Sequence, residues 1–518
     1  MLGKWITRHK NIILLIACVL LVPSVIGYVS TRVNYDVLSY LPNTLETVSG
    51  QDTLVDEFGM GAFSMIVVED MSNKQAAALE KKIEGIDHVK DVLWYDDMLD
   101  ISVPTEMLPK NLEEAFFNGN ATMMIALFDD TTSADDTMDA ITNIRKTVGK
   151  DVYASGMSGI VTDIKNLALQ EMPIYVVIAA VLSLVVLLIT MDSFLTPFIF
   201  LANIGMAIVF NLGSNIFLGE ISYITQALAA VLQLAVTMDY SIFLLESYEA
   251  NKKRFPDDRK RAMAHAISNT FKSVSSSSVT TIAGFVALCF MTFKLGANIG
   301  IVMSKGVVIG VITCVTVLPA MILTFDNAIE KTTHKALIPP LTKVSDFIVK
   351  HYKIAIVVFL VLLGPAIYGN SNYKIYYNID QGLPKNIPSA EANDKLKEHF
   401  NMSNVHMVLL KDGLSAKDKN QMIKKIEKVD GVKWVIGLNS LVGPNFPETM
   451  IPEDVKSMLK TDKYELQFVC SDYSSATDEV NAQLDEMQKI VKGYQKDAMV
   501  IGEAPLMKDL QDTTDIDL

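Results

Sequence analysis

Seven long apolar segments constrain the fold of this chain more than any other feature of its sequence. Each runs for about 18 residues or more with few charges, the length that an α-helix needs to cross a hydrocarbon core roughly 30 Å thick. The segments lie near residues 11–29, 173–191, 195–218, 223–246, 275–293, 297–325 and 353–370. They predict a polytopic α-helical membrane protein with seven spans in this chain.

Two long polar stretches interrupt these spans and divide the chain into parts. Basic residues gather near residues 4–10, 252–261 and 331–353. Because basic loops stay on the cytoplasmic side, we expect a cytoplasmic N-terminus and two extracytoplasmic polar domains. The expected parts are a tail with the first span, a polar domain, a five-helix bundle, a cytoplasmic linker, the seventh span and a second polar domain, at residues 1–30, 31–171, 172–325, 326–352, 353–370 and 371–518.

Several classes of function can be set aside from charge and motifs. The net charge of −14 disfavours a nucleic-acid partner, because phosphate backbones attract basic surfaces. The sequence contains no G-x-x-x-x-G-K-[ST] phosphate loop, no G-x-S-x-G elbow and no His/Cys group with metal-ligand spacing. We therefore expect neither an enzyme nor a bound metal or organic cofactor.

The chain repeats itself at an offset of 342 residues. The matched positions pair His9 with His351, Pro23 with Pro365, Gly27 with Gly369, Leu41-Pro42 with Leu383-Pro384, and Met65–Asp70 with Met407–Asp412. Near the ends of the polar domains, Gly156 and Asp163 match Gly502 and Asp509 at an offset of 346. Internal repeats of this kind are common in transporters.

Each polar domain has the alternation of two βαβ passes. In the first, strands are expected near 63–69, 89–95, 122–129 and 151–156, with helices near 73–85 and 132–148. In the second, strands are expected near 405–411, 432–438, 464–471 and 499–503, with helices near 416–428 and 476–496. This order is typical of a split βαβ, or ferredoxin-like, layer of helices on a sheet, and an unrelated α+β domain is the alternative.

The repeat also predicts a larger protein. At the offset of 346, Leu518 falls opposite Met172, the position just before the second span. The second half therefore lacks the five-helix bundle that the first half has. We expect the chain to correspond to seven of twelve spans.

Asp239 is an ionisable residue inside the fourth apolar segment. Placing a carboxylate there costs roughly 2.5–3.5 kcal/mol on insertion scales, so such residues usually mark an ion path or a buried partner. Taking up a proton removes the charge and changes what the helix can pack against. The alternative is a carboxylate held by neighbouring hydroxyls that never titrates. Tyr240 follows at once and points about 100° away around the helix.

Helical spacing adds second-shell candidates to this pair. Glu246 lies two turns further on the same face, as an inner proton exit or as a charge at the interface. Thr237 and Ser241 are four residues apart and can bond their own helix backbone instead. The polar start of the fifth span supplies Ser277, Ser278 and Thr281, which could steady Asp239 or only allow close helix packing.

The order of spans and polar domains is similar to that of the resistance-nodulation-division (RND) superfamily. Within it, the chain resembles the MmpL-type, or hydrophobe/amphiphile efflux-3, branch. The residues that carry this resemblance are Asp239-Tyr240 followed by Ile242-Phe243-Leu244, the segment Ser275–Met291, and the Gly306…Leu318-Pro319 end of the sixth span. The resemblance implies an RND-like bundle with two extracytoplasmic α+β ferredoxin-like porter domains in a bacterial cytoplasmic membrane.

The resemblance also implies a function. Asp239 would carry the coupling proton, with Tyr240 as its gating hydrogen-bond partner, and the substrate would be membrane lipid or another amphiphile. A second Asp-Tyr pair is expected on a tenth span, so a missing transmembrane half or a homo-oligomeric partner would complete the site. We expect proton-driven export of lipids or amphiphiles. The alternative is a non-transporting, sterol-sensing-like lipid-binding or regulatory module, or an inactive fragment.

Overall fold

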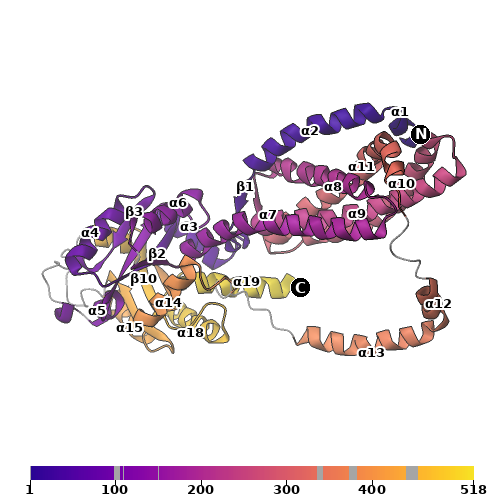
Figure 1. Ribbon diagram of the computed structural model, residues 1–518. Coiled ribbons are helices and arrows are strands. Elements are labelled where there is room, and N and C mark those ends of the chain that lie inside the picture. The colour runs from indigo at the N-terminus through magenta and orange to yellow at the C-terminus, as the bar shows by residue number, and fades with distance from the viewer. Residues whose placement is uncertain are drawn as a thin grey trace. The chain divides into compact units, whose positions relative to one another are not determined.

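The computed structural model describes seven stretches of the chain (Figure 1). They are residues 2–97, 105–108, 110–149, 151–334, 342–372, 382–438 and 453–517. The chain forms two compact units. The first is helical and comprises Met1–Val33, Gln170–Met291 and Gly296–Ile375; the second is of α+β type and comprises Asn34–Leu169, Thr292–Leu295 and Tyr376–Leu518.

The helical unit contains the segments that were predicted as spans, and six of its helices fit that prediction. Its helices are α1 (Leu2–Arg8), α2 (Lys10–Ser30), the apolar part of α7 (Met157–Thr190), α8 (Thr196–Gly213), α9 (Tyr223–Arg254), α10 (Arg259–Leu288), α11 (Lys294–Lys331), α12 (Thr342–Lys350) and α13 (Tyr352–Ser371). The 3-10 turn η4 (Ser214–Leu218) follows α8, and β1 (Arg32–Asn34) pairs with β7 (Glu220–Ser222). Among the described residues, six helices are long and apolar enough to cross a membrane: α2, α7, α8 with η4, α9, α11 and α13.

The predicted span at 275–293 differs from the expectation. These residues form the C-terminal part of α10, which ends at Leu288 and is not among those six helices. Four consecutive serines, Ser275–Ser278, lower its apolar character, and the helix stops five residues before the predicted end. The N-terminal half of α10 is instead packed inside the unit, with Ala262, Met263 and Ile267 fully buried.

Glycines let the helices of this unit approach closely. A Cβ at Gly213 of α8 would lie 2.0 Å from the Ser24 carbonyl oxygen of α2. A Cβ at Gly27 of α2 would lie 2.2 Å from the Gly213 carbonyl oxygen. Since real Cβ atoms never come this close to another backbone, α2 and α8 pack together only because both positions lack a side chain.

The α+β unit contains two domains with the same order of strands. In the first, β2 (Ala62–Glu69), α4 (Asn73–Glu84), β3 (Val89–Leu93), β5 (Ala121–Phe128), α6 (Asp135–Thr147) and β6 (Val152–Ser155) form a sheet in the order β3-β5-β2-β6. In the second, β8 (Asn404–Lys411), α15 (Ala416–Ile426), β9 (Val432–Gly437), β10 (Tyr464–Ser471), α18 (Asp478–Tyr494) and β11 (Met499–Gly502) form the order β11-β8-β10-β9. The predicted strands and helices of both domains are confirmed.

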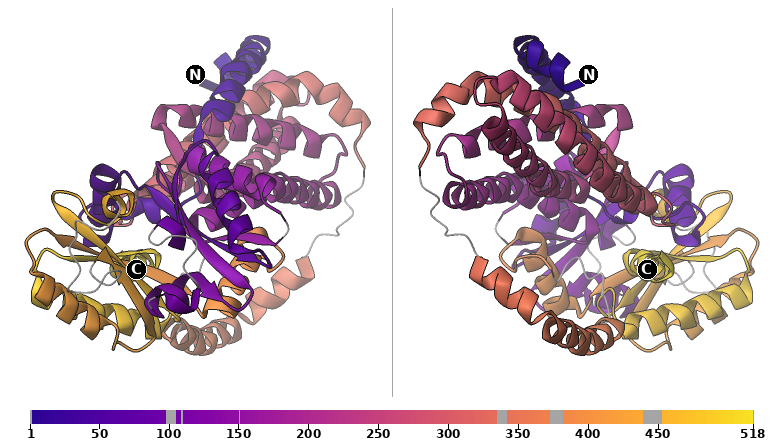
Figure 2. Two further views of the ribbon diagram at one scale, coloured as in Figure 1. Left: turned by 90° about the vertical axis from the view of Figure 1, so that its left-hand side faces the viewer. Right: turned by 90° about the vertical axis from the view of Figure 1, so that its right-hand side faces the viewer.

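Shorter elements complete this unit. They are η1 (Leu38–Tyr40), α3 (Glu46–Phe58), η2 (Tyr95–Asp97), η3 (Thr105–Met107), α5 (Lys110–Phe116), β4 (Phe117–Asn118), α14 (Pro388–Phe400), α17 (Glu453–Leu459) and α19 (Glu503–Asp517). The central strands β2 and β8 pair antiparallel with both of their neighbours. Strand β5, at the centre of the first sheet, is buried along its whole length. Figure 2 shows the first sheet in purple and the second in orange to yellow.

Each sheet packs against a helix from the other domain. The first-domain helix α3 packs against β11 of the second sheet, and the second-domain helix α14 packs against β6 of the first. The contact is close: a Cβ at Gly50 of α3 would lie 2.5 Å from Ile501 Cγ2. The two domains are therefore interlocked.

The interlock uses matched positions of the sequence repeat. Asp163 in α7 accepts a hydrogen bond from the Ser389 backbone N–H at 2.8 Å, at the second residue of α14. Asp509 in α19 accepts one from the hydroxyl of Thr47, the second residue of α3. Thr47 and Ser389 are separated by the offset of 342, and Asp163 and Asp509 by 346. The predicted repeat is thus confirmed as a structural repeat.

Candidate functional site

Asp239 and Tyr240 lie on different faces of α9. The Asp239 side chain is exposed on the surface of the helical unit, whereas Tyr240 is 4% exposed and packs in its apolar core. Within the described part of the chain, no hydrogen bond or ion pair holds the Asp239 carboxylate. The predicted Asp-Tyr pair therefore does not hydrogen-bond to itself, in line with its helical spacing. Glu246, two turns further along, is exposed as well.

The predicted hydroxyl candidates bond mainly to their own helices. Ser241 donates to the Thr237 carbonyl oxygen at 2.8 Å, and Ser278 donates to the Val274 carbonyl oxygen at 2.7 Å. Thr281 donates to the Ser277 carbonyl oxygen at 3.3 Å. Ser277 itself is exposed. None of these hydroxyls binds Asp239, so the described residues support backbone bonding over a role in holding the carboxylate.

A largely buried network of polar side chains joins three helices of the helical unit. Lys305 of α11 donates to the Asn211 carbonyl oxygen of α8 at 2.9 Å and to the Asn215 side chain. The Asn211 amide donates to Gln233 Oε1 of α9 at 3.0 Å, and Gln233 donates to the Gly306 carbonyl oxygen of α11 at 3.3 Å. Three helices are thereby joined by hydrogen bonds inside an apolar bundle, where such bonds have little competition from water.

Thr237 lies beside these hydrogen-bonded side chains, and its hydroxyl is unsatisfied. Its Oγ1 is buried, and none of the described residues forms a hydrogen bond with it. The backbone of α11 passes very close, since a Cβ at Gly310 would lie 2.7 Å from Thr237 Oγ1. Asn203 of α8 is also fully buried, and both polar atoms of its side chain lack a partner among the described residues. The interior of this unit therefore retains hydrogen-bonding capacity that the described fold does not use.

The ends of α9, α10 and α11 are joined by an ion-pair network. Asp326 of α11 is buried and pairs with Arg259 of α10 at 2.6 Å and with Lys252 of α9 at 3.6 Å. The Tyr248 hydroxyl donates to the same carboxylate at 3.2 Å. Arg259 and Lys252 also reach Glu330. Part of the basic group at 252–261 thus forms ion pairs that hold the helices together.

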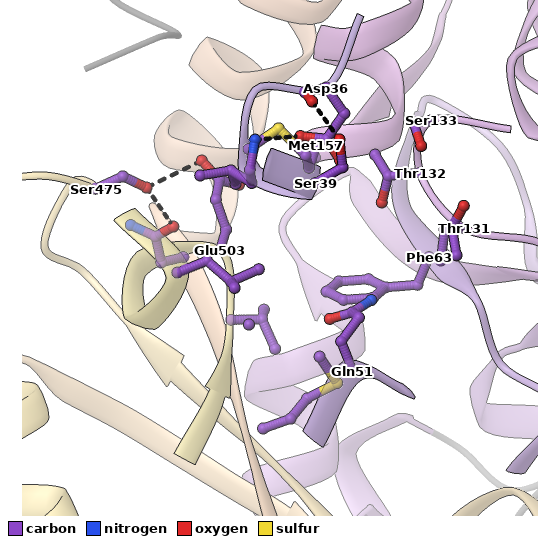
Figure 3. Close-up of a pocket in the computed structure, with 18 of the residues that line it drawn as sticks. Asp36, Ser39, Gln51, Phe63, Thr131, Thr132, Ser133, Met157, Ser475 and Glu503 are labelled. Atoms are coloured by element: carbon purple, nitrogen blue, oxygen red, sulfur yellow. Dashed lines mark hydrogen bonds between the residues drawn. The ribbon is translucent and has the colours of Figure 1, made fainter. Parts of the chain in front are cut away.

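The α+β unit contains a cavity of ≈ 260 Å³ lined by both of its domains (Figure 3). Residues at equivalent positions of the sequence repeat line the cavity in pairs. Met65 is equivalent to Met407, and Gly156 is equivalent to Gly502. Both glycines have positive φ, 96° and 125°, where a strand turns into the following helix. The cavity therefore lies on the axis of the internal repeat.

The cavity is rich in hydrogen-bond acceptors and carries negative charge. Asp36, Asp52 and Glu503 line it, together with hydroxyl and amide side chains. Figure 3 shows the aromatic ring of Phe63 beside Gln51 and Thr131. No lysine, arginine or histidine is among the described residues that line it. Burial raises the pKa of Asp36 to about 6, although the Leu38 backbone N–H donates to its carboxylate at 2.9 Å. Such a lining favours cationic or hydroxylated groups over anionic ones.

Sequence reasoning missed Lys305 and the cavity. Lys305 met the criterion that singled out Asp239, an ionisable side chain within an apolar segment, and the same search could have found it. The cavity left no such signal. Its lining residues come from distant parts of the chain, and their apolar members look like core residues in sequence.

These features define a multi-pass membrane protein whose bundle carries ionisable groups and whose paired α+β domains enclose a cavity. The sequence model of the MMPL family matches residues 56–338, more than half of the chain. The chain belongs to the MMPL family, as its resemblance to MmpL-type RND transporters led us to expect.

Several characterised or curated proteins are similar to the chain. It is 23% identical over 362 residues to the siderophore exporter MmpL5 of Mycobacterium tuberculosis (strain CDC 1551 / Oshkosh), covering 66% of this chain and 37% of that protein. It is 23% identical over 315 residues to the probable transport protein MmpL12 of the same organism, covering 58% of this chain and 27% of that protein. A 122-residue match to the putative membrane protein ActII-3 of Streptomyces coelicolor is 29% identical and covers 24% of this chain and 17% of that protein. The matches thus span less than two-fifths of each relative.

Proposed function

We propose that this chain is part of a proton-driven exporter of lipids or other amphiphilic molecules. The observation that carries the proposal is Asp239, a carboxylate on a membrane-spanning helix without a partner among the described residues, in a chain of the MMPL family. The similarity to an exporter of siderophores supports transport of molecules of this kind.

Asp239 takes up and releases the coupling proton in this proposal. An exposed carboxylate on a spanning helix costs roughly 2.5–3.5 kcal/mol in lipid, and the cost falls when the group is protonated or covered. A second transmembrane half or another copy of the chain covers this face of α9. Tyr240 lies on a different face, so it serves as gate for a carboxylate on a neighbouring helix and not for Asp239.

The α+β unit is the porter part that receives the substrate. Its two sheets have the strand order of the split βαβ pattern, with the first strand central and the fourth at one edge, which supports two ferredoxin-like porter domains. Both lie outside the cytoplasmic membrane, with the N-terminus inside. The cavity between them binds the polar end of the amphiphile, for which hydroxyl and carboxylate side chains offer partners.

Transport can be tested in vesicles that contain the chain as it is isolated, with any copies or partners that remain bound. An inward proton gradient is imposed, and movement of the fluorescent amphiphile N-phenyl-1-naphthylamine is followed together with internal pH. We expect gradient-dependent probe movement and proton uptake, both abolished by Asp239→Asn. The matched control is Glu249→Gln, another exposed carboxylate of α9. Equal probe movement with and without the gradient would refute proton coupling.

A further inference from the structure

Three carboxylates converge in the first α+β domain, apart from the cavity. Glu80 belongs to α4, and Asp96 and Asp97 belong to η2, the turn that follows β3. One oxygen from each lies within 4.8 Å of the others. The contact brings together segments that are separate along the chain, so sequence spacing gave no indication of it.

Glu80 of this cluster is buried, and the hydrogen bonding of the cluster is incomplete. Glu80 is only 3% exposed, yet its Oε1 has no hydrogen-bond partner among the described residues. The same holds for Asp96 Oδ1, another buried oxygen. Asp97 is better satisfied, because the Trp94 backbone N–H donates to its Oδ2 at 2.9 Å. Leaving a buried acceptor unsatisfied costs about 1–3 kcal/mol, and more when it is charged.

Further acidic side chains surround the cluster and increase its negative charge. Glu84 and Asp91 add negative charge close enough to act electrostatically on the cluster, and the positive charge of Lys81 acts in the opposite direction on Asp96. Burial and the negative charge of Asp96 raise the pKa of Glu80 well above its usual range. A carboxyl in this position either keeps a proton or faces a positive ion.

We propose that Glu80, Asp96 and Asp97 form a binding site for a hard divalent cation of the Ca²⁺ class. Ca²⁺ takes oxygen ligands at 2.3–2.6 Å, so two of its ligands can be up to about 5 Å apart. Three oxygens within 4.8 Å of one another fit around one such ion. Water would complete its coordination, since Asp96 and Asp97 are partly exposed. The two unsatisfied oxygens, Glu80 Oε1 and Asp96 Oδ1, are the natural first ligands.

The ion would connect α4 to the segment after β3 and so stabilise the first domain. This role does not depend on transport. The alternative occupant is a proton shared between Glu80 and Asp96, which would leave no affinity for metal. A direct binding experiment distinguishes the bound cation from the shared proton.

Terbium luminescence provides that experiment, because Tb³⁺ occupies Ca²⁺ sites and is excited by nearby aromatic rings. Trp94 and Tyr95 immediately precede Asp96 and are both fully buried. We expect the detergent-purified full chain, stripped with a chelator, to give Tb³⁺ luminescence that Ca²⁺ displaces. Ca²⁺ alone should also raise its thermal midpoint. Absence of Ca²⁺-displaceable luminescence in the wild-type chain would overturn the proposal in favour of the shared proton.

Variants assign the ion to these residues. Glu80→Gln and Asp97→Asn should each weaken Ca²⁺ affinity at least tenfold, and Asp97→Asn provides the readout if the buried Glu80 variant fails to fold. Glu114→Gln removes an exposed carboxylate of the same domain and should leave the affinity unchanged. Wild-type affinity in folded Asp97→Asn and Glu80→Gln proteins would place the ion elsewhere and contradict the assignment.

Discussion

At the scale of single residues, Asp36 links the cavity of the α+β unit to pH. Burial raises the pKa of this carboxyl from 3.8 to about 6, so the folded protein disfavours its ionised form. The unfolded chain releases the same proton more readily. The free energy of unfolding therefore decreases as the pH rises from about 4 to about 6, because the unfolded chain loses the Asp36 proton first. Above about pH 6 the full destabilisation by Asp36 is present.

Replacing Asp36 by Asn removes this cost. We expect Asp36→Asn to gain stability over wild type between pH 4 and 7, by up to roughly 3 kcal/mol for a shift of about two units. Thermal unfolding of the purified chain across this pH range measures the difference. Asp52→Asn, an exposed carboxylate on the same cavity, is the control. A difference between Asp36→Asn and wild type that is constant with pH would argue against a buried charge.

Single residues also show where sequence reasoning ends. Asp239 could be found because an ionisable group in an apolar segment is conspicuous, and its separation from Tyr240 follows from helical geometry. That its carboxylate is exposed could not be predicted, since periodicity gives the faces of a helix but not what covers them. Glu80 and Asp96 look like ordinary surface acids in sequence, because only the fold brings them together.

At the scale of elements, glycine contacts hold the helical unit together. The α2–α8 contact depends on Gly213, where a side chain would collide with the backbone at Ser24. In the same helix, a Cβ at Gly205 would have no heavy atom within 4 Å. Comparing substitutions at the two positions therefore distinguishes the cost of a steric collision from the cost of replacing a glycine in this helix.

Gly213→Val should destabilise the helical unit by about 3 kcal/mol or more, because overpacking against backbone cannot be relieved by a side-chain movement. Gly205→Val lies in the interior of the same helix, where the new Cβ meets no heavy atom within 4 Å, and should be close to neutral. The fraction of monodisperse protein after stepwise heating in detergent measures both variants. Similar losses in the two variants would show that the α2–α8 contact contributes little.

The elements themselves were largely predictable, and their exceptions have physical causes. The eight strands that were predicted for the two sheets follow from short β-branched runs bounded by turn residues, and the structure confirms them. The fifth predicted span was less well placed, because its serines weaken the apolar signal and α10 ends at Leu288. The sequence did not indicate that α3 and α14 each pack on the sheet of the other domain. The pattern of an amphipathic helix shows which face is buried but not which sheet that face contacts.

At the scale of the whole molecule, the interlocked domains predict mutual dependence. Polypeptides 34–169 and 382–517 should each be poorly folded alone, because β6 and β11 lose the helices that cover them. Produced together, they should form a stable one-to-one complex. Asp163→Ala should destabilise the first domain by about 3–5 kcal/mol, since it leaves the partly buried Arg145 of the same polypeptide unpaired. It should also weaken the complex, because it removes the hydrogen bond from the Ser389 N–H.

Size-exclusion chromatography and circular dichroism of the separate and combined polypeptides test this dependence. Thr47→Ala removes one hydrogen bond from the matched contact to Asp509 and should have a smaller effect, about 1 kcal/mol. Independent folding of both polypeptides without association would contradict the interlock.

The proton at Asp239 is the centre of the functional account, and proton uptake by vesicles containing the chain measures it most directly. With an inward gradient and amphiphile present, the account predicts substrate-stimulated uptake for wild type and for Glu249→Gln. Asp239→Asn, at equal abundance in the membrane, should show only the leak of empty vesicles. Undiminished, substrate-stimulated uptake by Asp239→Asn would contradict the account.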